Sequence, residues 1–404
     1  MDKRSSGRKT LTRRNCMRYG GAVIGAGLLA GCTSDSSGSD DATETATTTE
    51  TETETDTTTT AEADESYTVT MAPAGEVTFE SVPESWVAYD GGYADMGVAL
   101  GVGDRMTGIG GAGRYYSYVY DELPGVSIDR EQIEQNQLSD GDMSKEMFYE
   151  LDNDVHLMDP EMLVNWFGWK QEDVDEISKN VAPFVGNLNF RREDEWHDYR
   201  YYTLYEAFEK MAEVFQERER YEAFKELHDE FIADIQTKLP PADERPNVLL
   251  VYAGSDQPEA FSPYRLNDKG TSKKQWHDLG VSDALAGTGV KGLSTTDRGK
   301  IDYETMLEID PDVILLRAHE RKSATEFRDT VLDFMQSHPV ASELTAVQNE
   351  RVYRGGYLYQ GPIQNLFLTE RGAQQLFPGV FGEVTGDTEL FDRQRVADIV
   401  TGSS

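Results

Sequence analysis

The side chains of this 404-residue chain that are best suited to chemistry are arginines beside aromatic residues. Basic residues are scarce, because 74 aspartates and glutamates stand against only 38 lysines and arginines. A guanidinium can bind an anion through two parallel N–H groups, and a neighbouring ring can stack on a planar group. The pattern therefore predicts sites for an anionic, partly planar small molecule.

Twelve residues in such surroundings are candidates for ligand contacts. In the first half of the chain they are Arg114, Tyr115, Tyr116, Trp166, Trp169, Arg191 and Arg192. In the second half they are Arg265, Arg317, His319, Tyr357 and Tyr359. For each of them, packing in the core or on the surface is the competing explanation, since single aromatic residues serve that purpose most often.

The predicted strands explain why these positions matter. Short apolar runs at 86–89, 106–109, 155–158, 247–252 and 313–316 are bounded by turn residues and separated by helical stretches. Continuous apolar runs of this kind indicate parallel strands covered on both faces, so the fold class is α/β. In such sheets ligands bind beyond the carboxyl ends of the strands, where Arg114 and Arg317 stand.

An internal repeat predicts two similarly built lobes. Residues 146–158 and 304–316 align without a gap at an offset of 158, and six of the thirteen positions are identical. Each copy has the pattern of a helix, a tight acidic turn and a strand. A chance recurrence of a common unit is the alternative.

The stretch from Tyr201 to Leu239 has apolar residues at helical spacing and contains no glycine or proline. It predicts one long connecting helix or two abutting helices. A single helix of this length would span about 57 Å and would join the lobes as a rigid strut.

Residues 1–32 have the features of an export signal. Arg13-Arg14 precede an apolar stretch of about a dozen residues, which is too short to span a membrane. The stretch ends in Leu-Ala-Gly-Cys32, which resembles a lipobox, so we expect Cys32 to be lipidated; an ordinary cleavage site is the alternative. Cys16 is the one other cysteine, which excludes a disulfide or thiolate chemistry in the mature body.

Composition sets the remaining boundaries. Residues 33–66 are rich in Thr, Ser, Asp and Glu and are predicted to form a disordered tether. The predicted N-terminal lobe covers 67–200, the connecting helix 201–239 and the C-terminal lobe 240–404.

The net charge of −36 argues against nucleic acid as a partner. Such a surface is typical of adaptation to high salt, where the distance over which charges interact, the Debye length, falls to about 3 Å at 1 M.

Two other classes of protein are disfavoured. No nucleophile elbow, His-Glu-x-x-His or phosphate-binding Gly-Lys-Ser/Thr motif occurs, so an enzyme is not expected. The six histidines are widely separated, and His197, His277 and His319 could meet only through loops. We therefore expect no cofactor and no resident metal. A surface adhesion protein would fit the tether but not the repeat.

The body of the chain, roughly 67–404, resembles the substrate-binding proteins of ABC importers for iron(III)-siderophores, haem and cobalamin. Residues 87–109 resemble the first strand, helix and second strand of that family, and residues 303–316 resemble its helix, Asp-Pro-Asp turn and strand. The aromatic stretch 165–200 departs from the shorter first lobe of many members. The signal and tether fit an archaeal or bacterial lipoprotein form.

The resemblance implies the following expectations. Two Rossmann-like lobes joined by a long helix would hold a small ligand in the cleft between them. A ferric siderophore is the leading ligand, with cobalamin, haem or an oxyanion as alternatives. Glu146 and Glu304 match the positions that dock on the membrane permease, which works with an ATPase. We expect a monomer on the outer face of the cytoplasmic membrane, held by its lipid anchor.

Overall fold

The structure is a computed structural model that describes residues 66–138, 143–192, 194–268, 270–290, 299–384 and 388–403. The predicted signal peptide, including Cys32, and the predicted tether up to residue 65 lie outside the described residues. None of the helices in the described ranges combines the length and apolar character needed to span a bilayer.

The N-terminal lobe is built on a parallel sheet with the strand order β4-β3-β5. Its strands are β3 (Trp86–Ala88), β4 (Met106–Ile109) and β5 (Val155–Leu157). The antiparallel hairpin of β1 (Tyr67–Met71) and β2 (Gly75–Phe79) precedes them. The helices of this lobe are α1 (Gly91–Ala99), α2 (Arg130–Gln135), α3 (Lys145–Leu151), α4 (Pro160–Phe167) and α5 (Gln171–Asn180).

The C-terminal lobe has a mixed sheet in which the order is β10-β9-β6-β7 and β8 also pairs with β6. Its strands are β6 (Asn247–Tyr252), β7 (Ser262–Tyr264), β8 (Ser282–Asp283), β9 (Val313–Arg317) and β10 (Val352–Arg354). All pairs are parallel except β6 with β7. The helices are α8 (Lys274–Asp278), α9 (Tyr303–Ile309), α10 (Ala324–Phe327), α11 (Asp333–Ser337), α12 (Thr345–Gln348), α13 (Pro362–Leu376) and α14 (Pro378–Phe381).

Both sheets are covered on both faces, as the continuous apolar runs predict. In β9, Val313 and Leu315 face one hydrophobic cluster, whereas Ile314 and Leu316 face another. Successive side chains of a strand point to opposite faces, so only a strand buried on both sides can be apolar at every position. The predicted α/β class with mainly parallel sheets is confirmed.

The connecting segment takes the second of its two predicted forms, a pair of abutting helices, and not the single long helix. It forms α6 (Leu204–Phe215) and α7 (Arg218–Lys238), because the chain leaves helical geometry at Gln216, whose φ is +56°. Phe208 of α6 packs on both Tyr221 and Phe224 of α7, so the two helices fold back on each other. The expected span of about 57 Å is therefore wrong, and the 21 residues of α7 extend over about 32 Å.

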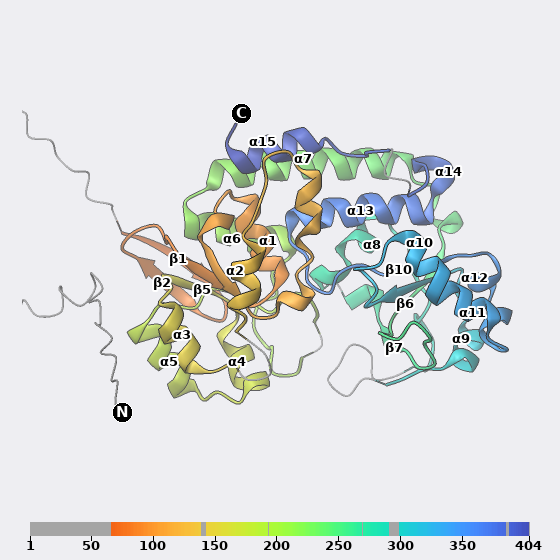
Figure 1. The fold of residues 1–404 in the computed structure, drawn as a ribbon, viewed down its shortest axis with the longest axis horizontal. Coiled ribbons are helices and arrows are strands. Elements are labelled where there is room, and N and C mark those ends of the chain that lie inside the picture. Colours follow the sequence, from red (N-terminus) through yellow and green to blue (C-terminus); the bar gives the residue numbers. More distant parts are fainter. Residues whose placement is uncertain are drawn as a thin grey trace, which may run out of the picture. The chain divides into compact units, whose positions relative to one another are not determined.

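The two lobes share one hydrophobic core. The largest cluster of buried residues includes Trp86 of β3, Phe224 of α7 and Leu315 of β9. Helix α15 (Arg393–Thr401) runs along α7, and α13 packs on α1 of the N-terminal lobe (Figure 1). This continuity indicates that the lobes can move relative to each other only to a modest extent.

The internal repeat is visible in the backbone. Helix α3 leads through a turn to β5, and α9 leads through a matching turn to β9. Asp154 Oδ2 accepts a 3.0 Å hydrogen bond from the backbone N–H of Ser85, just before β3. Its counterpart Asp312 Oδ2 accepts a 2.8 Å bond from the N–H of Asn247, the first residue of β6. Equivalent carboxylates in the two lobes thus bind the backbone at the start of the equivalent neighbouring strand.

Candidate functional site

The carboxyl ends of the strands in the two lobes lead into segments that meet through tyrosines. Tyr116 follows β4, and its ring stacks on that of Tyr357, which follows β10. The ring centroids lie 4.4 Å apart with an interplanar angle of 13°. Arg321 crosses between the lobes in the same region, with its guanidinium 5.7 Å from the Tyr116 ring and Nη2 donating to Gly113 O at 3.3 Å.

A chain of hydroxyl hydrogen bonds extends this contact. Tyr357 Oη donates to Tyr118 Oη at 2.9 Å, and Tyr118 Oη donates to the carbonyl oxygen of Glu320 at 2.9 Å. The Glu320 carboxylate in turn pairs with Arg371 at 2.7 Å and accepts from the N–H of Gly356. Burial raises the pKa of Tyr357, which keeps its hydroxyl protonated as a donor.

Arg114 lies in a second aromatic group beside this contact. Burial alone would lower its pKa, but Tyr359 and Tyr89 outweigh that effect and raise it. Tyr89 comes directly after β3, and its ring packs edge-on against Tyr359 at 6.0 Å. Tyr252, at the end of β6, also contributes to the raised pKa of Arg114, so phenols from both lobes lie near this exposed guanidinium.

The aromatic group continues into the aromatic stretch 165–200 of the N-terminal lobe. Phe190 packs on Tyr359 at 4.8 Å and on Trp166 at 6.2 Å. Arg191 lies over the Trp166 ring at 4.8 Å, and its Nε donates to Asp194 at 2.7 Å. The positive charge of Arg191 is therefore already matched by a buried carboxylate.

The structure brings together some of the twelve candidates at the junction of the lobes and places others elsewhere. Arg114, Tyr116, Trp166, Tyr357 and Tyr359 contribute to the tyrosine contact and the adjoining aromatic group. Arg265 is partly exposed and, within the described ranges, has no ring or polar contact with either group. Arg192 lines a different cavity, beside α6 and α7.

Four candidates lie in the interior of a lobe. Tyr115 shares a hydroxyl hydrogen bond of 2.8 Å with the buried Tyr120. Trp169 donates to Met143 O at 2.6 Å within the core of the N-terminal lobe. Arg317 is 2% exposed, donates to Ser272 O at 2.5 Å and lies 4.8 Å from the Tyr264 ring. His319 is buried with Nε2 2.8 Å from Ala253 O.

Several residues at the junction were missed by the sequence analysis. Tyr89 and Tyr252 were interpreted only as the last positions of apolar strands, although Tyr89 lies one residue beyond β3 and Tyr252 ends β6 at the junction. Tyr118 and Arg321 lie two residues beyond chosen candidates, Tyr116 and His319. A search that included the last residue of each strand and more of the loop that follows it would have found all four residues.

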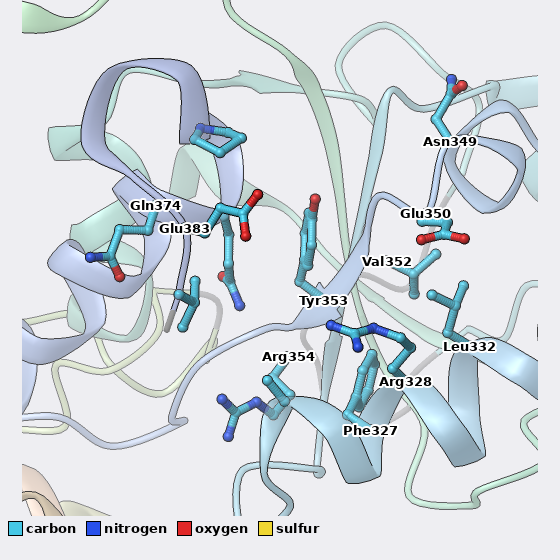
Figure 2. Close-up of a pocket in the computed structure, with 14 residues that line it drawn as sticks. Phe327, Arg328, Leu332, Asn349, Glu350, Val352, Tyr353, Arg354, Gln374 and Glu383 are labelled. Carbon is cyan, nitrogen blue, oxygen red and sulfur yellow. The ribbon is translucent and has the colours of Figure 1, made fainter. Parts of the chain in front are cut away.

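Two cavities are relevant here, the first at this junction and the second away from it. One of about 230 Å³ is lined by Ala112, Tyr118 and the candidate Tyr115 of the N-terminal lobe and by Arg321 of the C-terminal lobe. Another of about 440 Å³ lies within the C-terminal lobe (Figure 2). Arg328 and Arg354 line this second cavity with Glu350, and none of the twelve candidates does.

No group of three or more His, Cys, Asp or Glu residues in the described ranges is arranged to hold a metal ion. His156 is fully buried and contacts the rings of Phe148 and Phe184. Burial lowers the pKa of His156 to about 3 and that of His197 to about 4, so both rings are neutral near pH 7.

Glu146 and Glu304 occupy equivalent places in the repeat. Each lies in the first turn of its helix, α3 or α9, and each is exposed. A carboxylate in the first turn is stabilised by the helix dipole, so helix stability alone is a sufficient reason for both. Their exposure leaves both available to a partner.

Comparisons with known proteins agree with this arrangement. The family described as "Periplasmic binding protein" matches residues 87–357. A search of curated proteins finds no match. A periplasmic binding protein from Veillonella parvula is 17% identical, with a TM-score of 0.56, and the match covers 77% of this chain and 97% of that chain.

Two further solved structures are similar at the level of the fold. The petrobactin-binding protein YclQ from Bacillus subtilis is 17% identical with a TM-score of 0.52, covering 78% of this chain and 99% of that chain. The haem-binding protein HmuT is 17% identical with a TM-score of 0.52, covering 76% and 89% respectively.

Proposed function

This chain belongs to the periplasmic binding protein family, and we propose that it captures an iron(III)-siderophore-type chelate for an ABC importer. The substrate-binding role follows from the family. The observation that carries the ligand proposal is the position of Arg114, which interacts with Tyr89 from one lobe and with Tyr252 and Tyr359 from the other. A ligand held there contacts both lobes at once.

The chemistry of this region fits an anionic chelate with a flat or cyclic organic shell. Arg114 and Arg321 are cationic, although the chain as a whole carries a net charge of −36. The rings of Tyr89, Tyr116 and Tyr359 offer apolar faces and phenol hydroxyls. Arginine beside aromatic rings binds a delocalised anion through hydrogen bonds and stacking together.

Delivery to the membrane would use the exposed acids of the repeat. Glu146 and Glu304 stand on α3 and α9, at matching points of two similar units. A permease that presents one basic group to each lobe would recognise both lobes together. The partners in this proposal are that permease and its ATPase, and the binding protein acts as a monomer.

The export route completes the proposal. Arg13-Arg14, the short apolar stretch and Cys32 direct the chain to the outer face of the cytoplasmic membrane as a lipoprotein. The acidic residues that follow form a tether, and the acidic surface suits a high-salt environment. The absence of a catalytic motif in the sequence supports a binding role without enzymatic activity.

Haem or cobalamin is the second candidate ligand in the same role. The aromatic group of Phe190, Trp166 and Tyr359 favours it, because a large planar ring gains contact area from stacked side chains. The haem-binding HmuT shares the fold, which by itself does not select a ligand. Direct binding of an oxyanion would use Arg114 without the aromatic faces.

Ligand screening tests the proposal. The purified protein is titrated in high salt with a ferric trihydroxamate, a ferric catecholate, haem, cobalamin and molybdate, and tryptophan fluorescence is recorded. The chain has five tryptophans, and Trp166 lies in the aromatic group, so binding should change the emission. We expect a ferric chelate to bind most tightly. Tight binding of molybdate alone, with no response to any chelate or macrocycle, refutes the ligand assignment.

A further inference from the structure

A third cavity, of about 550 Å³, lies where the connecting helices meet the C-terminal lobe. Three parts of the chain line this hinge cavity. Arg192 comes from the segment that leaves the N-terminal lobe, Tyr205 and His228 come from α6 and α7, and Lys274 and Asp278 come from α8.

The hinge cavity is separated from the lobe junction by paired backbone. The N–H of Thr271 donates to Asn189 O at 3.0 Å, and the N–H of Ser272 is 3.4 Å from Phe190 O. Gly270 lies so close to Phe190 O that an added Cβ would be only 2.2 Å from it. The ring of Phe190 packs on Tyr359 at the junction, whereas Gly270 and Thr271 on the other segment of this contact line the hinge cavity.

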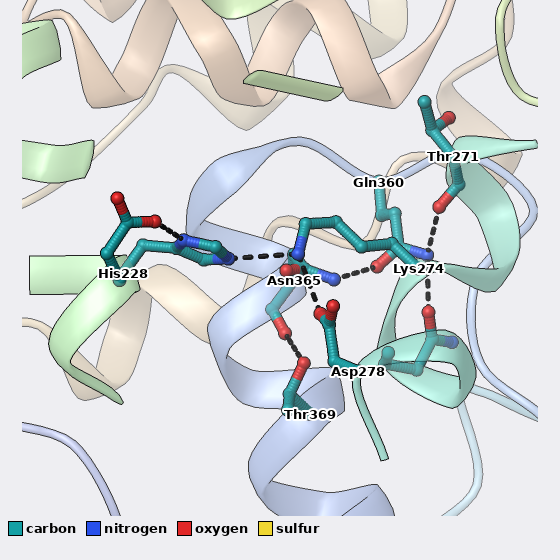
Figure 3. A network of polar contacts seen from close by, with 9 residues as sticks. His228, Thr271, Lys274, Asp278, Gln360, Asn365 and Thr369 are labelled. Carbon is teal, nitrogen blue, oxygen red and sulfur yellow. Dashed lines mark hydrogen bonds and ion pairs between the residues drawn. The ribbon is translucent and has the colours of Figure 1, made fainter. Parts of the chain in front are cut away.

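The two aspartates that line the hinge cavity already form ion pairs with lysines. Lys274 Nζ pairs with Asp278 at 2.6 Å, and Lys225 pairs with Asp229. Figure 3 shows Lys274 Nζ also reaching toward the ring of His228. Among the described residues that line it, the cavity therefore has two matched ion pairs and one additional cation, Arg192.

His228 is held neutral and does not alter this balance. Burial, followed by the charge of Lys274, lowers the pKa of His228 to about 3. The neutral ring donates from Nδ1 to Asp229 Oδ1 at 3.0 Å and accepts from Lys274 Nζ at Nε2, at 2.9 Å. Lys274 thus uses two of its three N–H donors on Asp278 and His228, which leaves one for a ligand.

Two buried polar atoms that belong to residues lining the cavity have no hydrogen-bond partner within the described part of the chain. They are Nε of Arg192 and Oη of Tyr205. Within the same part of the chain Arg192 has no ion pair, and its guanidinium rests over the Tyr201 ring at 5.0 Å. Buried donors are nearly always satisfied by protein, water or ligand, and both of these atoms can donate.

We propose that the hinge cavity binds a small organic anion, whose carboxylate or phosphate accepts from Arg192, Tyr205 and Lys274. The apolar part of that molecule packs on Leu204 and on the ring of Tyr205. The volume exceeds what a single inorganic ion requires, which favours an anion carried on an organic group. Because the walls come from both lobes and the helices that join them, occupancy of this site is coupled to the arrangement of the lobes.

Titration calorimetry on the purified full-length chain tests this site, with benzoate and phenyl phosphate as probes. We expect one benzoate per chain and at least tenfold weaker binding in Arg192→Gln and in Tyr205→Phe, which removes only the hydroxyl. Arg200→Gln is the matched control, because Arg200 is in the same segment, is exposed and pairs with Glu206. Its benzoate affinity should stay within twofold of the wild type, and near-UV circular dichroism checks the fold of each variant.

Three results would overturn the proposal. One is benzoate binding that Arg192→Gln and Tyr205→Phe leave unchanged. Another is loss of benzoate binding in Arg114→Ala alone, which would place the anion at the lobe junction. A third is equal affinity for neutral benzyl alcohol, which would show an apolar site without anion recognition. Since the ligand screen of the lobe junction uses other probes, failure of one proposal does not imply failure of the other.

Discussion

Asp152 and Asp310, which are 158 residues apart, end their helices with the same left-handed φ of +46°. Asp152 lies three residues before β5, which is at the edge of its sheet, and Asp310 lies three residues before β9, which is inside its sheet. Few L-residues adopt this conformation without cost, and aspartate is among those that tolerate it best. The sequence repeat is thus a repeat of backbone geometry.

This geometry predicts the effect of substitutions at Asp310. Asp310→Gly should be more stable than Asp310→Ala by about 1 kcal/mol, because glycine adopts positive φ without a Cβ clash. Urea unfolding measures the difference. Glu308, exposed and within α9, is the matched control, and there the order should reverse, with alanine more stable than glycine by about 1 kcal/mol. The same order at both positions would contradict the assigned backbone geometry.

The tyrosine contact between the lobes predicts a loss of stability in Tyr357→Phe. The variant keeps the stack on Tyr116 but removes the hydroxyl that donates to Tyr118. One buried neutral hydrogen bond contributes about 1 kcal/mol, and Tyr357→Ala should cost about 3–5 kcal/mol. Tyr149→Phe removes an exposed hydroxyl that donates to Glu176 and should change stability by less than about 0.5 kcal/mol. Equal effects of the two phenylalanine variants would show that the hydroxyl hydrogen bond of Tyr357 between the lobes contributes nothing to stability.

His156 predicts a specific pH dependence of folding. Its pKa falls from 6.5 in the unfolded chain to about 3 in the folded protein because the ring is buried. Between these values only the unfolded chain binds the proton, so stability is lost as pH falls from 6.5 toward 3, by about 1.4 kcal/mol per pH unit.

The comparison of wild type with His156→Leu isolates this effect. The free energy of unfolding of the variant should decline less steeply between pH 6.5 and 4, whatever its absolute stability. Asp95, whose pKa burial raises to about 7, contributes a slope of opposite sign in both proteins and cancels in the difference. Parallel pH profiles would mean that His156 does not titrate as its burial requires.

The equivalent acids Glu146 and Glu304 predict a separation of binding from transport. Replacing both with lysine should leave ligand affinity in solution unchanged and reduce uptake by cells at least tenfold. The double variant Glu150→Lys with Glu308→Lys is the control, since these acids are also exposed equivalents in the repeat, one turn further along α3 and α9. Uptake reduced equally by both pairs would indicate a general charge effect and not a docking site.

The fold could be predicted to a large extent from the sequence. The strands at 106–109 and 247–252 have the bounds that the sequence predicts, and in the second the four central residues, 248–251, are all apolar and buried, as a strand covered on both faces requires. The reversal at Gln216 was missed, since the periodicity of 201–239 continues through it with no glycine or proline. Packing of Phe208 on Tyr221 and Phe224, and not local propensity, determines that turn.

The site could be predicted only in part. Arg114 and Tyr115 are neighbours after the same strand, yet the first is exposed and the second is bonded to Tyr120 in the core. Beyond the end of a strand the chain has no fixed period, so the sequence does not reveal which side chain faces inward. Arg317 shows the same problem, because its residue type predicts a ligand contact whereas its position in β9 buries it.

The most direct test of the central claim is the affinity of a ferric trihydroxamate for wild type and for Arg114→Ala, measured by titration calorimetry in high salt. The account predicts at least tenfold weaker binding in the variant, because the guanidinium among the phenols of both lobes is lost. Arg218→Ala, on the exposed surface of α7, should bind as the wild type does. Equal affinity of wild type and Arg114→Ala would contradict a ligand site at the junction of the lobes.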